Sequence, residues 1–383
     1  MKTAIWLYLF LFIAFFDLHA QYPILTPFAV SLGAAPTFIG WMMGIYSLTH
    51  LPGNLLAGPR IDRNGSRRYI MFSLTAAGIV LIMQAYVQSP WELLLLRSIS
   101  GFVLAFLSPA CLALLAQLSA NPVTQGKYMS GHGVVHTLAS VVSPAAGAFI
   151  VASFGFSGTF RTLGIILLVT GIMAFFTIPQ QLAGAQPSRS TALAKQEPER
   201  RRMLSWRHYL LPLTIACAQG ILFYELPLRE GGNSTILSTG LLFSIISLGA
   251  LFTLSMLFIN KYSPLLRIAL SVLVMALCFY MLAALPSIRL EAVLFVLGMS
   301  KGIVFPAMAS MFISLGGGKL GRTFALHSIA TSIGSFLGPI AAGQLREGFS
   351  PYFIAFLILM TGLLFLPRHR AVKPVTLPVS RQA

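Results

Sequence analysis

Two polar side chains stand one helical turn apart in a long apolar run near the start of the chain. In WLYLFLFIAFFDLHAQYPILTPF, Asp17 and Gln21 share one helix face because they are four residues apart, whereas His19 points elsewhere. An ionised carboxylate within a bilayer costs about 3 kcal/mol on insertion scales, so Asp17 should face a cavity or a partner. Desolvation favours the protonated form of a carboxyl group. Asp17 is therefore a candidate for proton uptake and release, and Gln21 for lining the same cavity.

Two further charged groups lie inside apolar runs. Arg97, in RSISGFVLA, needs a partner or a water-filled cavity if it is buried in a membrane. The alternative is an arginine whose guanidinium extends to the membrane surface. Glu225 lies toward the outer end of its run, where a role in proton or substrate binding and a role as an interfacial acid stay equally open.

His132 and His136 are also one helical turn apart, and Ser140 and Ser143 continue the same stripe. A histidine pair can bind a metal or titrate near neutral pH, but a metal needs further ligands and none is visible nearby. Hydrogen bonding between helices is the alternative. We expect these histidines, and His327, which occupies a related position, to lie near a substrate cavity without a metal.

The elements that position these residues are membrane helices. The chain of 383 residues is 56% hydrophobic and only 9% charged, whereas a soluble domain carries about 25% charged residues. Continuous apolar runs of about 20 residues, the length that crosses a bilayer, indicate helices rather than a barrel. We expect twelve spans, at 4–27, 37–57, 69–87, 91–117, 126–153, 159–180, 208–229, 236–258, 265–285, 289–314, 320–345 and 351–367.

The basic residues predict the orientation. The net charge of +17 gathers in alternate connections between the spans and in the tail, not on an amphipathic surface, so a nucleic-acid partner is not expected. Lys and Arg collect in cytoplasmic loops, which places both termini in the cytoplasm. The resulting domains are a six-helix bundle at 1–180, a polar linker at 181–207, a second six-helix bundle at 208–367 and a tail at 368–383.

The two halves carry a weak internal repeat. GKYMSGHGVVHTLASVVSPAAG, from residue 126, aligns with GRTFALHSIATSIGSFLGPIAAG, from residue 321, at an offset that pairs His132 with His327 and Pro144 with Pro339. FFDL at 15–18 is echoed by FYEL at 223–226. Such repeats are typical of secondary transporters, in which the substrate binds between the halves near mid-membrane. No Gly-Lys-Ser/Thr phosphate loop is present, so ATP-driven transport is not expected.

The most specific motif is GPRIDRNGSRR, between the second and third spans. The whole chain resembles the major facilitator superfamily, whose loop at this place reads roughly G-x-L-a-D-r-x-G-r-[rk]. Arg60 and Ser66 depart from that pattern. In the family this loop latches the cytoplasmic side closed, and an aspartate in it can accept hydrogen bonds from arginines or a helix N-terminus. The resemblance implies a cytoplasmic gate of Gly58, Asp62, Arg63, Gly65, Arg67 and Arg68.

Two weaker patterns of the family indicate export. Arg97 and Gly101 resemble R-x-x-x-G-x-g-a, whose arginine is proposed to assist proton transfer in antiporters, although Val103 replaces a second glycine. ASVVSPAAGA resembles the G-x-x-x-G-P-x-x-G-G stripe of exporters, although Ala139 and Ser143 replace glycines. Small residues let helices approach closely, which alone could explain the stripe. We expect helix packing at Gly101, Pro144, Gly147, Gly334, Gly338 and Pro339.

These features predict an all-α membrane protein of the major facilitator fold that is no enzyme and uses no cofactor. We expect a proton-coupled exporter of small amphipathic or drug-like molecules, similar to the drug:H+ antiporter branch, with proton coupling through Asp17, Arg97 and Glu225. Import or facilitated passage of a metabolite, or export of a metal-chelating metabolite, stays open. A monomer in a bacterial inner membrane, in contact with lipid, protons and its substrate, completes the expectation.

Overall fold

The computed structural model describes residues 2–118, 122–178, 206–228, 233–285, 289–315 and 320–366. Helices make up nearly all of this part of the chain. The expected linker at 181–207 lies outside it except for its last two residues, and the expected tail at 368–383 lies wholly outside it.

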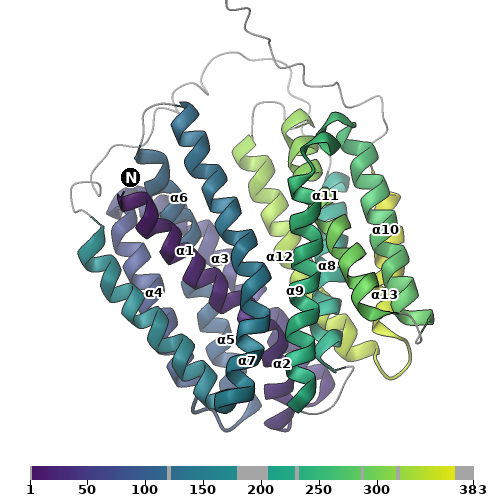
Figure 1. The fold of residues 1–383 in the computed structure, drawn as a ribbon, viewed down its shortest axis with the longest axis horizontal. Helices are drawn as coiled ribbons and strands as arrows, with labels where there is room; N and C mark the ends of the chain where they lie inside the picture. Colours follow the sequence, from purple (N-terminus) through teal and green to yellow (C-terminus); the bar gives the residue numbers. More distant parts are fainter. Residues whose placement is uncertain are drawn as a thin grey trace, which may run out of the picture.

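The first half contains seven helices, which are α1 (Lys2–Ala20), α2 (Tyr22–Ser31), α3 (Pro36–Asn64), α4 (Ser66–Gln84), α5 (Pro90–Leu104), α6 (Leu107–Gln117) and α7 (Pro122–Thr177). The second half contains α8 (Leu210–Glu225), α9 (Asn233–Ser255), α10 (Pro264–Ala284), α11 (Leu290–Leu315), α12 (Leu320–Leu345) and α13 (Pro351–Leu363). Figure 1 shows the halves as two bundles that lie side by side.

These helices make twelve membrane crossings in two pseudo-symmetric six-helix bundles. In the described part of the chain, nine segments are long and apolar enough to cross a membrane by themselves. One of them, Gly131–Thr177, holds two crossings, because Gly155 has a φ of 69° and separates α7 into two helical parts. The more polar α3 and the short α13 supply the remaining two crossings. The predicted fold class is confirmed.

Proline and glycine fix many of the helix boundaries. Five helices (α3, α5, α7, α10 and α13) begin at a proline, whose fixed φ suits the first turn and whose missing N–H has no partner there. The expected first span, 4–27, is interrupted at Gln21, between α1 and α2. Pro23 cannot donate the hydrogen bond that would continue α1, because it has no backbone N–H. This interruption places Gln21 inside the first crossing, between α1 and α2.

The arginine-rich segment is mostly helical rather than a loop. We expected the second span to end at residue 57, but α3 continues to Asn64 and α4 begins at Ser66. Gly65 alone makes the turn, with a φ of 82°, a conformation that side chains other than glycine rarely adopt. Gly58, Asp62 and Arg63 therefore lie on the last turns of α3, and Arg67 and Arg68 on the first turn of α4.

The two halves meet along two helix pairs, α3 with α12 and α7 with α9. We call the end of the molecule where α3 begins the Pro36 end, and the opposite end, where α3 turns into α4, the Gly65 end. An added Cβ at Gly40 would lie 2.5 Å from the Pro339 carbonyl oxygen, and one at Gly240 would lie 2.6 Å from that of Pro144. In Figure 1, α7 and α9 converge toward the lower edge, which is the Pro36 end.

Candidate functional site: two cavities between the halves

Asp17, Gln21 and Arg97 form a buried hydrogen-bonded series in the first half. The Gln21 amide donates to the Asp17 carboxylate over 2.8 Å, and its oxygen accepts from the Arg97 guanidinium over 2.6 Å. The exposed fractions of the three side chains are only 2%, 4% and 6%. Gln21 thus connects an acid and a base that do not touch directly. When Asp17 is ionised, both bonds involve a charged group and each is stronger than a bond between neutral groups.

The first cavity lies against this series and has a volume of about 260 Å³. Gln21, Tyr46 and Arg97 line it from the first half, and the Arg97 guanidinium lies 4.8 Å from the centre of the Tyr46 ring. The second half contributes Gln219 and Ser335. This cavity therefore lies between the halves, and its wall includes both ends of the Gln21 hydrogen bond to Arg97.

A second cavity of about 390 Å³ adjoins the first. Tyr22 of α2 and Phe223 of α8 line both cavities, and their rings stack with centres 4.1 Å apart. His19 and His136 line the second cavity from the first half, and Lys301 lines it from α11. One aromatic contact between the halves thus separates a cavity with an arginine from a cavity with a lysine.

Lys301 is a site residue that the sequence analysis missed. It lies in the middle of the apolar run LFVLGMSKGIVFPAM, so the rule that singled out Asp17 should also have identified it. Its Nζ lies 5.7 Å from the ring centre of Phe223 and 5.9 Å from that of Phe305. His19 was also missed, because the face of α1 opposite Asp17 was not expected to meet a cavity.

The three expected histidines occupy different surroundings. His136 lines the second cavity. Its ring packs edge-on against the rings of Phe15 and His19, with ring centres 4.7 Å and 5.2 Å apart. The ring centre of His132 lies 5.6 Å from that of Phe15, and the ring centre of His327 lies 5.2 Å from that of Phe312. Neither histidine lines one of the two cavities. In the described ranges no group of three His, Cys, Asp or Glu residues could hold a metal ion.

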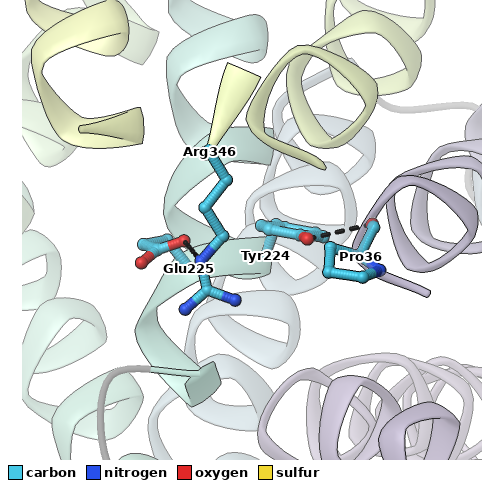
Figure 2. Close-up of polar contacts among 4 residues, drawn as sticks. All are labelled: Pro36, Tyr224, Glu225 and Arg346. Carbon is cyan, nitrogen blue, oxygen red and sulfur yellow. Dashed lines mark hydrogen bonds and ion pairs between the residues drawn. The ribbon is translucent and has the colours of Figure 1, made fainter. Parts of the chain in front are cut away.

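Glu225 lies at the Pro36 end, outside the linings of both cavities. Its carboxylate is 3.5 Å from Nε of Arg346, which follows α12. The neighbouring Tyr224 donates a hydrogen bond to the Pro36 carbonyl oxygen over 2.9 Å (Figure 2). Figure 2 shows both contacts on the short stretch of α8 that faces α3. Glu225 thus belongs to the region where the halves meet, and its expected part in proton coupling stays a prediction.

Among the described residues, no hydrogen bond or ion pair joins the expected gate residues to the second half. Asp62 and Arg63 are exposed, and for Asp62 no ion pair or hydrogen bond exists with any described side chain. Arg67 instead donates to the Phe175 carbonyl oxygen in α7, and its guanidinium lies 5.2 Å from the Phe175 ring centre. The segment is bound to its own half in this conformation.

The expected packing residues lie where helices approach closely. Gly101 faces the backbone of α3 at Tyr46, and Gly147 faces Ala20 at the end of α1. Gly334 and Gly338 face the backbone of α8, within the second half. The carbonyl groups of Pro144 and Pro339 face glycines of the other half, as described above.

Two six-helix halves around central cavities define a secondary membrane transporter. The chain belongs to the Major Facilitator Superfamily, because the model of that family matches residues 7–339. The superfamily consists of transporters rather than enzymes, so the protein is a multi-pass membrane transporter of small molecules.

Among curated relatives, the quinolone resistance protein NorA of Staphylococcus aureus (strain COL) is 23% identical, covering 95% of this chain and 96% of NorA. This likeness places the chain in a branch similar to drug-efflux transporters. Two solved structures share its fold with a TM-score of 0.71. One is a bacterial homologue of the human lysosomal transporter Spinster, in an inward-facing and unoccupied conformation, with 13% identity over 95% of this chain and 94% of that chain. The other is a D-xylose-proton symporter, which is 16% identical over 97% of this chain and 98% of that chain.

Proposed function

We propose that the protein is a proton-coupled exporter of small amphipathic molecules that works by alternating access. The observation that carries the proposal is the buried series Asp17–Gln21–Arg97, of which Gln21 and Arg97 line a cavity between the halves and Asp17 lies behind Gln21. An ionisable carboxyl group next to a central cavity is the element that proton coupling requires.

The series suggests how proton and solute exclude each other. When Asp17 is ionised, its charge balances that of Arg97 through Gln21. Protonation of Asp17 removes that balance, and the remaining positive charge disfavours a solute with a basic group in the first cavity. Protonation also weakens the hydrogen bond from the Gln21 amide, since a neutral acceptor binds less strongly than a carboxylate. Binding of a proton and binding of such a solute therefore oppose each other, which is the condition for exchange.

The direction rests on the orientation of the helices. The basic residues assign the Gly65 end to the cytoplasm and the Pro36 end to the outside. The halves are in contact at the Pro36 end, and at the Gly65 end no described residue forms a hydrogen bond or ion pair with the Asp62 side chain, so the conformation suits loading from the cytoplasm. The similarity to NorA, a resistance protein by name, favours export. A bacterial inner membrane and a monomeric transporter belong to the same proposal.

The test uses everted membrane vesicles, in which the Gly65 end would face the medium. Respiration acidifies the lumen, and an exporter then takes up an added amphipathic dye while protons leave. We expect dye-dependent alkalinisation of the lumen with the wild type, none with Asp17→Asn, and an unchanged signal with the control Glu291→Gln, an exposed acid. Unchanged coupling in Asp17→Asn would contradict the assignment of Asp17.

The same assay separates the alternatives. Movement of proton and solute in the same direction would indicate a symporter. One of the solved structures with the same fold is a D-xylose-proton symporter. Solute movement without proton movement in the wild type would indicate a facilitator. Activity only with iron-loaded chelators would indicate export of a metal-chelating metabolite. Each of these results would replace the proposed exporter.

A further inference from the structure

Lys301 is a cation in mid-membrane that no acid of the described chain neutralises. It lies near the centre of the membrane segment Leu290–Ser314. No carboxylate within the described ranges lies within ion-pair distance of its ammonium. Its near neighbours are the faces of Phe223 and Phe305, which attract a cation but do not cancel its charge. A charge within a membrane segment that has no charged partner is costly and marks a functional site.

Lys301 differs from Arg97, the corresponding cation of the first half, in having no carboxylate partner among the described residues. Each half places one cation on its fourth crossing, Arg97 on α5 and Lys301 on α11, and each cation lines one of the two cavities. Arg97 has a carboxylate of the protein within reach through Gln21. Lys301 has no such group among the described residues, so a molecule that occupies the second cavity can supply the negative charge.

We propose that the second cavity binds the carboxylate group of an amphipathic substrate, with Lys301 as its counter-charge. This inference rests on the proposed transport function and names the substrate class for the same central site. The Ser247 hydroxyl lines the cavity and can donate to the second carboxylate oxygen, whereas the hydroxyls of Thr137 and Ser140, which also line it, donate to backbone carbonyl oxygens of their own helix. Tyr22, Phe223, Phe243 and Phe305 provide the apolar wall for the rest of the molecule.

Lys301 is the one lysine or arginine in the described lining of the second cavity, which favours a ligand with a single negative charge. His19 donates from Nδ1 to the Phe15 carbonyl oxygen over 2.7 Å, so in the neutral imidazole its Nε2 is an acceptor, and His136 and Gln219 are further polar side chains of the wall that can donate. A phosphate dianion would carry one more charge than Lys301 neutralises, in a wall that is otherwise largely aromatic. The two cavities adjoin at Tyr22 and Phe223, and Asp17 lines neither of them.

The test compares three probes with one aromatic body, namely 2-naphthylacetate, 2-naphthylacetamide and 2-naphthylethylamine. Binding to the full-length protein in lipid nanodiscs is measured by calorimetry. We expect the wild type to bind the carboxylate about tenfold more tightly than the amide, the effect of one charged hydrogen bond. Lys301→Gln should remove this preference, and Lys301→Arg should keep it. The matched control Lys261→Gln, at an exposed lysine, should also keep it.

Two outcomes would overturn the proposal. One is a wild type that does not bind the carboxylate more tightly than the amide. The other is a preference that survives in Lys301→Gln, or in Lys301→Met if the glutamine variant does not yield folded protein. The proposed exporter is judged separately, because Asp17→Asn should abolish proton movement and leave the ratio of carboxylate to amide binding unchanged.

Discussion

Tyr224 and Pro36 join the two halves through one hydrogen bond, from the tyrosine hydroxyl to the proline carbonyl oxygen over 2.9 Å (Figure 2). The two residues are 188 positions apart in the chain. Next to this bond, Glu225 pairs with Arg346 within the second half, and farther along α3 Gly40 lies against Pro339 across the two halves. The Pro36 end is thus closed by a few identifiable contacts, which can be removed one at a time.

Tyr224→Phe should favour opening of the Pro36 end. The hydrogen bond between the halves is lost and the ring is kept, so the closed state should lose about 1 kcal/mol, or about fivefold in the equilibrium. Distance distributions between spin labels on the first turn of α3 and the last turn of α12 measure this population. Tyr280→Phe, at an exposed tyrosine, is the control. An unchanged distribution in Tyr224→Phe would show that this bond does not hold the end closed.

Gly40→Ala should separate α3 from α12. The added methyl would meet the Pro339 carbonyl oxygen at 2.5 Å, a distance that real Cβ atoms do not tolerate, and overpacking of this kind costs about 1–3 kcal/mol. We expect a larger opening of the Pro36 end than in Tyr224→Phe, read with the same labels. Gly133→Ala is the matched control, because nothing lies within 4 Å of a Cβ there. Equal behaviour of the two alanine variants would contradict the close approach.

Gln21→Leu should uncouple Asp17 from Arg97. Leucine has a similar volume but can neither donate to the carboxylate nor accept from the guanidinium, and hydrogen bonds to charged groups contribute about 1.5–3 kcal/mol each. We expect a lower melting temperature and fewer protons moved per solute in proteoliposomes that contain a pH-sensitive dye. Gln88→Leu, at an exposed glutamine, should change neither quantity. Full coupling in Gln21→Leu would mean that Asp17 acts without the bridge.

Asp62→Asn should slow transport without lowering stability. The Asp62 side chain is exposed here, so its neutralisation should change the free energy of unfolding by no more than about 0.5 kcal/mol. If the motif latches the Gly65 end in the alternate conformation, the exchange rate should fall severalfold while solute binding stays intact. The chain has only one other aspartate, Asp17, whose asparagine variant should show the converse pattern of lost coupling. An unchanged exchange rate in Asp62→Asn would contradict the latch.

The sequence by itself was sufficient for the architecture. Membrane helices need continuous apolar runs because lipid offers no hydrogen-bond partner to the backbone, so the crossings are directly visible in the order of residues. Two further patterns indicated the family, namely the repeat that pairs Pro144 with Pro339 and the motif around Asp62. Both can be recognised from the order of residues along the chain. Asp17 and Gln21 were placed on one face because four residues make about one helical turn.

Only the tertiary structure decided which side chains meet. The sequence did not indicate that Gln21 bridges Asp17 to Arg97, since that contact joins the first crossing to the fourth. The pairing of Glu225 with Arg346 likewise depends on how the last turn of α8 lies against the end of α12. Lys301 is visible in the sequence as a charge within an apolar run, but only the structure places Lys301 and His19 on the same cavity. Contacts between helices depend on the rotation and crossing of each helix, and a local pattern does not specify either of them.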